Sequence, residues 1–379
     1  MIIYADNAAT TKLSEKAFNA MLPYFRECYA NPSSAHFLGQ KARSALRESR
    51  SVIANCLNAG PNDKLIFTSG GSEADNLAIN SIASYGIRHN RRHIISSKFE
   101  HHAVLHSLAA LEKTGFEIEL LDIPEDGIIE PSAVAEAIRE DTAGVSIMFA
   151  NNEIGTIQRI EEIGRICRAH GILFHSDAVQ AVGHIRVDVD LANVDYLSFS
   201  SHKFHGPKGI GGLYVRENSP VSPLIYGGSQ EYGLRAGTEN LPGIVGTAVA
   251  LEESLEHLDY KISQTTAIRT YIQNEIASIP SVRLNGHPLE RLPGNLNFSF
   301  DGVDGDSLRY LLEEKGICAS AGSACNSSSS EPSHVLKALG LSDSLCKSAL
   351  RLSIDDSLSI QNAAYIVSSI KMILSELWD

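Results

Sequence analysis

The 379-residue chain has 43% hydrophobic and 20% charged residues, a composition that excludes disordered, collagen-like and coiled-coil proteins. Its net charge of −13 would repel a phosphate backbone, so we expect no nucleic acid partner. The six cysteines form no Cys-x-x-Cys pair and are too sparse for a disulfide scaffold, which favours a reducing compartment.

The beginning of the chain does not have the pattern of a secretory signal. An acidic residue, Asp6, interrupts the first apolar residues, and no basic residues precede them. No apolar run approaches the roughly 18 residues that a membrane-spanning helix needs. We therefore expect a cytoplasmic protein without a membrane partner.

Between residues 64 and 215, short apolar runs alternate with longer amphipathic stretches. This alternation is typical of the strands and helices of an α/β sheet. Strands are predicted at residues 64–68, 93–96, 117–121, 144–149, 172–175, 196–199 and 211–215. Helical periodicity in the spacers, as in residues 104–112 and 160–169, predicts right-handed crossovers and a mainly parallel sheet.

The pattern changes after residue 241. A stretch with few helix breakers extends to about residue 279, too long for a crossover, and is predicted as a helix that leaves the sheet domain. Beyond it, strands are predicted at residues 295–300, 317–319 and 349–354, and helices at 306–315, 333–339 and the C-terminal end. We expect a large domain of residues 15–257 and a small α+β domain of residues 1–14 plus 258–379.

Two segments after predicted strands have residues suited to chemistry. In Phe67-Thr-Ser-Gly-Gly-Ser-Glu-Ala-Asp75, Ser72 is predicted to cap a helix and Asp75 to complete a capping box. Such a helix start can bind a phosphate, although an ordinary capped turn explains the same residues. Asp177 ends an internal strand, where α/β sheets bind ligands. A helix N-terminus, a metal beside His175 or the protonated ring nitrogen of a cofactor could each partner this carboxylate.

A third segment runs from Ser198 to Gly212 and places Lys203 among hydroxyl and imidazole side chains, before a Gly/Pro-rich turn. A lysine in this setting can be desolvated enough to act as an amine nucleophile, so Lys203 is a Schiff-base candidate. Most single lysines are solvated surface charges. The helix start, the strand-end carboxylate and the lysine are, however, three of the parts that a pyridoxal phosphate site requires.

Motifs along almost the whole chain resemble those of one enzyme family. They are Asp6-Asn-Ala-Ala-Thr-Thr11, Asn31-Pro-Ser-Ser-Ala-His36, Thr68-Ser-Gly-Gly-Ser-Glu73, Glu100-His-His-Ala-Val104, Asn151-Asn-Glu-Ile-Gly-Thr156, residues 174–180, 201–209 and 235–240, and Gly322-Ser-Ala-Cys325. In this order they are similar to the cysteine desulfurases of the iron–sulfur cluster assembly branch, class V aminotransferase-like enzymes. The resemblance implies the α/β fold type I of pyridoxal phosphate enzymes, with the catalytic cysteine loop on the smaller domain.

The resemblance also implies roles around the cofactor, pyridoxal 5'-phosphate. Lys203 would hold it covalently, and Asp177 would pair with its ring nitrogen and make the ring an electron sink. Gln180 would face the ring hydroxyl, and His101 would stack on the ring and transfer protons. The phosphate would be held by Gly71, Ser72, Ser200 and His202, with Thr238 from a second subunit of a homodimer.

The resemblance also implies that Asn152 contacts both the cofactor and the substrate and that Arg351 clamps the substrate's carboxylate. Cys325, on a loop of small residues that ends in a serine-rich patch, would be the nucleophile that accepts sulfur as a persulfide. The implied reaction converts L-cysteine to L-alanine and passes the sulfur to a scaffold protein for iron–sulfur clusters or to another acceptor. A selenocysteine lyase or aminotransferase-like enzyme, and a sulfur-relay or assembly subunit of the same fold, remain alternatives.

Several residues depart from the family's pattern or fall outside it. Asp355 and Asp356 follow Arg351 where the family usually has Gly or Ser; they could weaken carboxylate binding, but we expect them to cap the last helix. Cys318 could form a disulfide with Cys325, but its apolar surroundings favour a role in the core. His102 and His106 are expected to be structural, and we expect no metal site.

Overall fold

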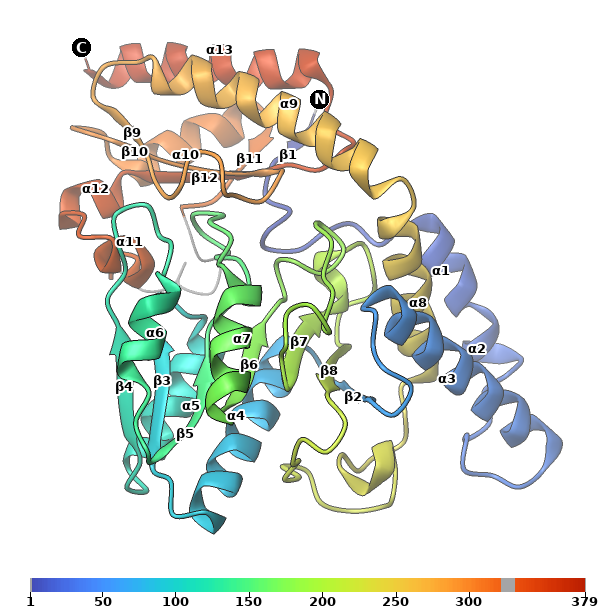
Figure 1. Cartoon of the computed structure of the whole chain (residues 1–379). Coiled ribbons are helices and arrows are strands. Elements are labelled where there is room, and N and C mark those ends of the chain that lie inside the picture. Colours follow the sequence, from blue (N-terminus) through green and yellow to red (C-terminus); the bar gives the residue numbers. More distant parts are fainter. Residues whose placement is uncertain (1, 322–330, 379) are drawn as a thin grey trace.

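The computed structural model describes residues 2–321 and 331–378. Its largest element is a seven-stranded sheet with the order β2-β8-β7-β6-β5-β3-β4 (Figure 1). The strands are β2 (Lys64–Thr68), β3 (His93–Ser97), β4 (Glu117–Leu121), β5 (Thr142–Ser146), β6 (Leu173–Asp177), β7 (Tyr196–Ser200) and β8 (Gly211–Val215). Only β8 runs antiparallel to its neighbours in this sheet, so the prediction of a mainly parallel sheet is confirmed.

Helices cover both faces of this sheet because its strands are apolar on both sides. Leu65 and Phe67 of β2 point into one core, whereas Ile66 between them points into another. One face is covered by α4 (Gly71–Arg88) and α5 (His102–Glu112). The other face is covered by α3 (Phe37–Cys56), α6 (Pro131–Ala137), α7 (Ile160–His170) and α8 (Leu241–Leu255), with α1 (Glu15–Met21) and α2 (Pro23–Arg26) beside them (Figure 1).

The prediction of one continuous helix over residues 241–279 is wrong, because the structure has two helices there. The stretch is divided into α8 and α9 (Leu258–Ala277), because His257 adopts a left-handed backbone conformation with φ 56°. Lys261 fixes the turn by donating to the Glu253 carbonyl near the end of α8, at 2.7 Å. The chain therefore changes direction here and passes into a second unit.

This second unit has a core of its own, built around an antiparallel sheet with the order β12-β10-β9. Its strands are β9 (Val282–Leu284), β10 (Asn295–Phe300) and β12 (Ala349–Ser353), and a parallel pair joins β1 (Ile3–Tyr4) to β11 (Ile317–Cys318). Its helices are α10 (Gly305–Glu314) and α13 (Ile360–Trp378), with α9 lying along α13 (Figure 1). The short helices α11 (His334–Ala338) and α12 (Asp343–Lys347) instead add apolar residues to the core of the large sheet.

The described cysteines, which are Cys28, Cys56, Cys167, Cys318 and Cys346, all have free thiols. Cys318 is half-buried and lines a hollow beside Arg309, so the prediction that it belongs to the core is wrong. Cys325 lies outside the described residues. Within the described ranges, no helix combines the length and apolar character needed to cross a membrane.

Candidate active site

A cavity of about 440 Å³ lies where the carboxyl ends of the central parallel strands meet the N-terminal segment and β12. Most of the residues assigned from the sequence line it: Gly71, Ser72, His101, Asn152, Asp177, Gln180, Ser200, His202, Lys203 and Arg351. Thr238 does not; it lines an adjoining hollow, which shares Ser69 and Gly209 with the cavity. The other assigned residue, Cys325, lies outside the described residues.

Lys203 enters the cavity from a short 3-10 turn, Ser201–Lys203, that directly follows β7. Its Nζ donates to the main-chain carbonyls of Ala8 and Ala9, at 2.6 and 2.9 Å. His184 holds the main chain at this residue, because its Nε2 donates to the Lys203 carbonyl at 2.7 Å. The amine is thus held by the N-terminal segment, a contact that sequence analysis did not predict.

Asp177 is the last residue of β6 and is almost completely buried. Its Oδ1 accepts a hydrogen bond from the Val179 amide at 2.9 Å. Burial, reinforced by the neighbouring carboxyl of Asp75, raises the pKa of Asp177 to about 7. A cationic ligand group beside this carboxyl would favour its ionised form.

The predicted capping box at Ser72 and Asp75 is wrong. Helix α4 begins at Gly71 without a side-chain cap, so Asp75 lies inside the helix and turns toward the sheet. Asp75 is 1% exposed, its Oδ1 lies 3.5 Å from His175 Nε2, and burial raises its pKa to about 7. Sequence analysis missed this buried acid because α4 begins two residues earlier than predicted, with Gly70 rather than Ser72 at the N-cap position.

The uncapped start of α4 is suited to an anion. First-turn amides of a helix have no intrahelical partners, and the helix dipole adds a positive end there. A Cβ on Gly71 would come within 2.6 Å of Val179 Cγ2, so this position needs glycine. Ser200 and His202 lie beside it, and burial lowers the pKa of His202 to about 4, so its imidazole is neutral.

His101 is held in one tautomer. It caps α5, with its Nδ1 accepting from the Ala103 amide at 3.1 Å, so the ring proton is on Nε2. Burial and the charge of Lys203 lower its pKa to about 4. His102 instead packs against the rings of His106 and His334, with centroids 4.9 and 4.5 Å away.

Arg351 projects from β12 and is fully buried. Its Nη1 donates to the Asn152 carbonyl at 3.0 Å, and its Nη2 donates to Asp6 Oδ1 at 2.8 Å.

Asp355 does not contribute to this site. Its carboxylate accepts from the Ser357 amide at 3.1 Å and faces His205 at 3.9 Å. The last helix is capped by Ser359, so the prediction that Asp355 and Asp356 cap it is wrong.

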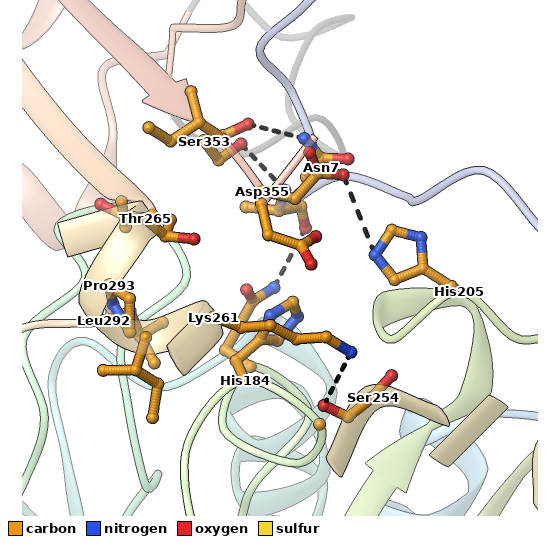
Figure 2. A pocket seen from close by; sticks show the side chains of 18 of the residues that line it. Asn7, His184, His205, Ser254, Lys261, Thr265, Leu292, Pro293, Ser353 and Asp355 are labelled. Carbon is orange, nitrogen blue, oxygen red and sulfur yellow. Dashed lines mark hydrogen bonds and ion pairs between the residues drawn. The ribbon is translucent and has the colours of Figure 1, made fainter. Parts of the chain in front are cut away.

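A second hollow is lined by residues of α8, α9 and the end of β12, together with His184 and His205 (Figure 2). It shares Ala8 and Gln180 with the main cavity. Figure 2 shows Asn7 beside Ser353, where the Asn7 amide donates to the Ser353 carbonyl at 3.0 Å. These contacts fix the N-terminal segment between the two units.

The arrangement fits pyridoxal phosphate. Lys203 offers an amine for the cofactor's aldehyde, Asp177 a carboxylate for its ring nitrogen, and the start of α4 a site for its phosphate. Asp75, His101 and Asp177 also present ligand atoms within 4.8 Å of one another, as a metal site would. The adjoining Lys203 ammonium and the use of His101 Nδ1 as a helix cap favour the cofactor.

Comparison with protein families gives a match to Aminotransferase class-V over residues 3–362. A cysteine desulfurase IscS of Methanosarcina thermophila is 48% identical, over 93% of this chain and 87% of the relative. A cysteine desulfurase IscS of Dictyoglomus turgidum is 45% identical, over 99% of this chain and 95% of the relative.

Solved structures are similar over the same extent. A NifS-like protein superimposes with a TM-score of 0.91 at 36% identity, covering 99% of this chain and all of that protein. SspA, solved in complex with cysteine, superimposes with a TM-score of 0.82 at 39% identity, covering 93% of this chain and 99% of SspA.

Proposed function

This chain belongs to the class V aminotransferase family and, within it, to the pyridoxal phosphate-dependent cysteine desulfurases, and we propose that its cavity converts L-cysteine to L-alanine. The observation that carries the proposal is that one cavity is lined by Lys203, Asp177 and Arg351. An amine, a carboxylate and a guanidinium are suited to the cofactor's aldehyde, its ring nitrogen and the α-carboxylate of an amino acid.

Pyridoxal phosphate bound there supplies an electron sink that acidifies the Cα proton of the substrate. Asp177, when ionised, keeps the proton on the ring nitrogen. Lys203, once the substrate amine has displaced it, is a free amine placed to accept the Cα proton. His101 Nε2–H adds a neutral proton donor at the ring, consistent with its lowered pKa.

Arg351 orients the substrate by its carboxylate, and Asn152 contributes its main-chain carbonyl to hold Arg351. The Cys325 thiolate then attacks the substrate sulfur. A sulfur–sulfur bond forms, the substrate's carbon–sulfur bond breaks, and the carbon skeleton takes up a proton to become L-alanine. Cys325 is left as a persulfide, which can pass its sulfur to an acceptor.

We further propose an iron–sulfur scaffold protein as one such acceptor. The names of the IscS relatives and the resemblance in sequence support this acceptor. The net charge of −13 favours an acceptor with a basic docking face. A cytoplasmic location is supported by the free thiols among the described cysteines.

A homodimer is part of the same proposal. Thr238 lines a hollow that adjoins the main cavity but does not line the cavity itself, which agrees with a role in the partner's site. Large apolar side chains that stay exposed on α1, α2 and the start of α3 offer a surface for the second copy; they include Phe18, Phe25 and Phe37. The division into domains at residue 257 is supported by the turn between α8 and α9.

The test is to measure L-alanine and sulfide together from L-cysteine in the presence of a reductant. We expect equal amounts from the wild type. Cys325→Ala should keep the change in the cofactor's absorption spectrum on adding L-cysteine but release no sulfide. Cys318→Ala is the matched control and should release sulfide as the wild type does. Unchanged sulfide release by Cys325→Ala would instead indicate a selenocysteine lyase-like route.

A further inference from the structure

Residues 6–11 connect the two ends of the active-site cavity. The carbonyls of Ala8 and Ala9 accept from Lys203, and the side chain of Asp6, two residues earlier, accepts from Arg351. The sequence resemblance matched this segment as a motif but assigned no role to Asp6. Its carboxylate is the anionic partner of Arg351 in the described part of the chain.

Arg351 needs such a partner because its guanidinium is buried. Its side chain is only 1% exposed, and apart from Asp6 the one acceptor of its guanidinium among the described residues is the neutral Asn152 carbonyl. Its Nε is buried and has no hydrogen-bond partner within the described ranges. An unpaired buried charge is strongly unfavourable, so the pair with Asp6 stabilises the guanidinium before any substrate binds.

Asp6 is itself held in register with β12. It forms an isolated parallel bridge with Ser353, whose amide donates to the Ala5 carbonyl at 2.8 Å. The Ala8 amide donates to Ser353 Oγ, also at 2.8 Å. Because these bonds flank Asp6, its carboxylate is fixed opposite Arg351 rather than reaching it from a flexible chain end.

We propose that Asp6 is a positioning residue that orients the Arg351 guanidinium to receive the α-carboxylate of the substrate. The inference rests on the proposed function, in which Arg351 is the carboxylate clamp. Arginine has five N–H donors in a rigid fork. Asp6 and Asn152 each occupy one donor on a different terminal nitrogen, which fixes the plane of the fork and leaves donors on both nitrogens for the substrate.

The experiment compares ligands that differ only in the carboxylate. L-alanine has an amine and a carboxylate, whereas ethylamine is the same molecule without the carboxylate. Each is titrated into the protein loaded with pyridoxal phosphate, and its dissociation constant is read from the change in the cofactor's absorption spectrum. The proteins are the wild type, Asp6→Ala, Asp6→Asn and, as a matched control, Asp355→Asn, which removes a nearby carboxylate that does not face Arg351.

We expect Asp6→Ala to weaken L-alanine binding about tenfold and to leave ethylamine binding unchanged. Asp6→Asn keeps an oxygen acceptor but loses the charge, so its effect on L-alanine should be smaller and in the same direction. In steady-state assays, KM for L-cysteine should rise while kcat changes little. Asp355→Asn should match the wild type with both ligands.

Two results would overturn the inference: unchanged L-alanine binding in the Asp6 variants, or an equal loss of L-alanine and ethylamine binding, which indicates general damage to the site. If Asp6→Ala does not fold, the same criteria apply to Asp6→Asn. Failure of the proposed function is a different result, because the wild type itself would then show no spectral response to L-cysteine or L-alanine.

Discussion

The two ends of the cavity differ in how their charges are balanced before any ligand binds. At the substrate end, the cationic Arg351 is already paired with Asp6 at 2.8 Å. At the cofactor end, Asp177 and Asp75 lie buried close together, and burial raises the pKa of each to about 7. At the substrate end, the buried charge therefore has its partner in the free protein. At the cofactor end, ionisation of Asp177 becomes favourable only when the cationic ring of the cofactor lies beside it.

The largest effect is expected from removing the carboxylate at the cofactor end. Asp177→Ala should weaken pyridoxal phosphate binding about 100-fold, because a charged hydrogen bond to the ring nitrogen is lost. The same variant, freed of cofactor, should be no less stable than the wild type at pH 8, because an uncompensated buried charge is gone. Cofactor titration and chemical denaturation measure the two effects.

Asp122→Ala is the control for this prediction, since Asp122 is 90% exposed and lies in a surface ion pair. Its cofactor affinity should equal that of the wild type. If Asp177→Ala protein binds pyridoxal phosphate as tightly as the wild type, Asp177 does not contribute to cofactor binding.

At the substrate end, unlike at Asp177, a substitution should reduce the stability of the cofactor-free protein. Arg351→Ala leaves Asp6 without its cation and opens a space in the core, so it should destabilise the protein by about 2–3 kcal/mol. Arg283→Ala, which breaks an exposed ion pair with Glu125, should change stability by no more than about 0.5 kcal/mol. Denaturant unfolding of cofactor-free protein checks both; equal stability of the two variants would show that the pair with Asp6 contributes little.

The difference between the two ends also explains what the sequence could predict. Asp177 and Ser200 are the last residues of β6 and β7, and Lys203 closely follows β7; the carboxyl ends of parallel strands meet at one edge of a sheet. Apolar runs and local motifs were therefore enough to bring them together. The presence of Gly71 and Ser72 in the same cavity was predictable for the same reason, since both follow β2.

The substrate end depends on pairing across the chain. Asp6 and Arg351 are 345 positions apart, and their contact requires the register between Asp6 and Ser353, which no local pattern indicates. The turn at His257 was missed because a left-handed residue other than glycine has no strong sequence signal. Asp75 was misplaced because its environment depends on the residue at which α4 begins.

The smallest predicted effect separates Asp75 from Asp177. Folding raises the pKa of Asp75 to about 7 from an ordinary value near 4, so the native state holds its proton more tightly than the unfolded state. The contribution of Asp75 to stability therefore falls as the pH rises from about 4 to about 7. Buried histidines such as His175, whose pKa is lowered to about 4, make the stability rise over part of the same pH range. The contribution of Asp75 must therefore be measured by comparing a variant of this residue with the wild type.

Relative to the wild type, Asp75→Asn should gain at least about 1 kcal/mol of stability between pH 4.5 and pH 7.5, in cofactor-free protein. Asp259→Asn, at a position that is 86% exposed, is the control and should show no such trend. A stability difference for Asp75→Asn that does not depend on pH would mean that Asp75 does not titrate in this range.

The most direct test of the active-site cavity is to locate the cofactor on the chain. The protein is loaded with pyridoxal phosphate and treated with borohydride, and the labelled peptide is identified by mass spectrometry. The label should be on Lys203, and Lys203→Ala protein should take up none and lose the cofactor's absorption band. A label on another lysine, such as Lys208 in the same cavity, or a wild type that binds no pyridoxal phosphate, would contradict the account.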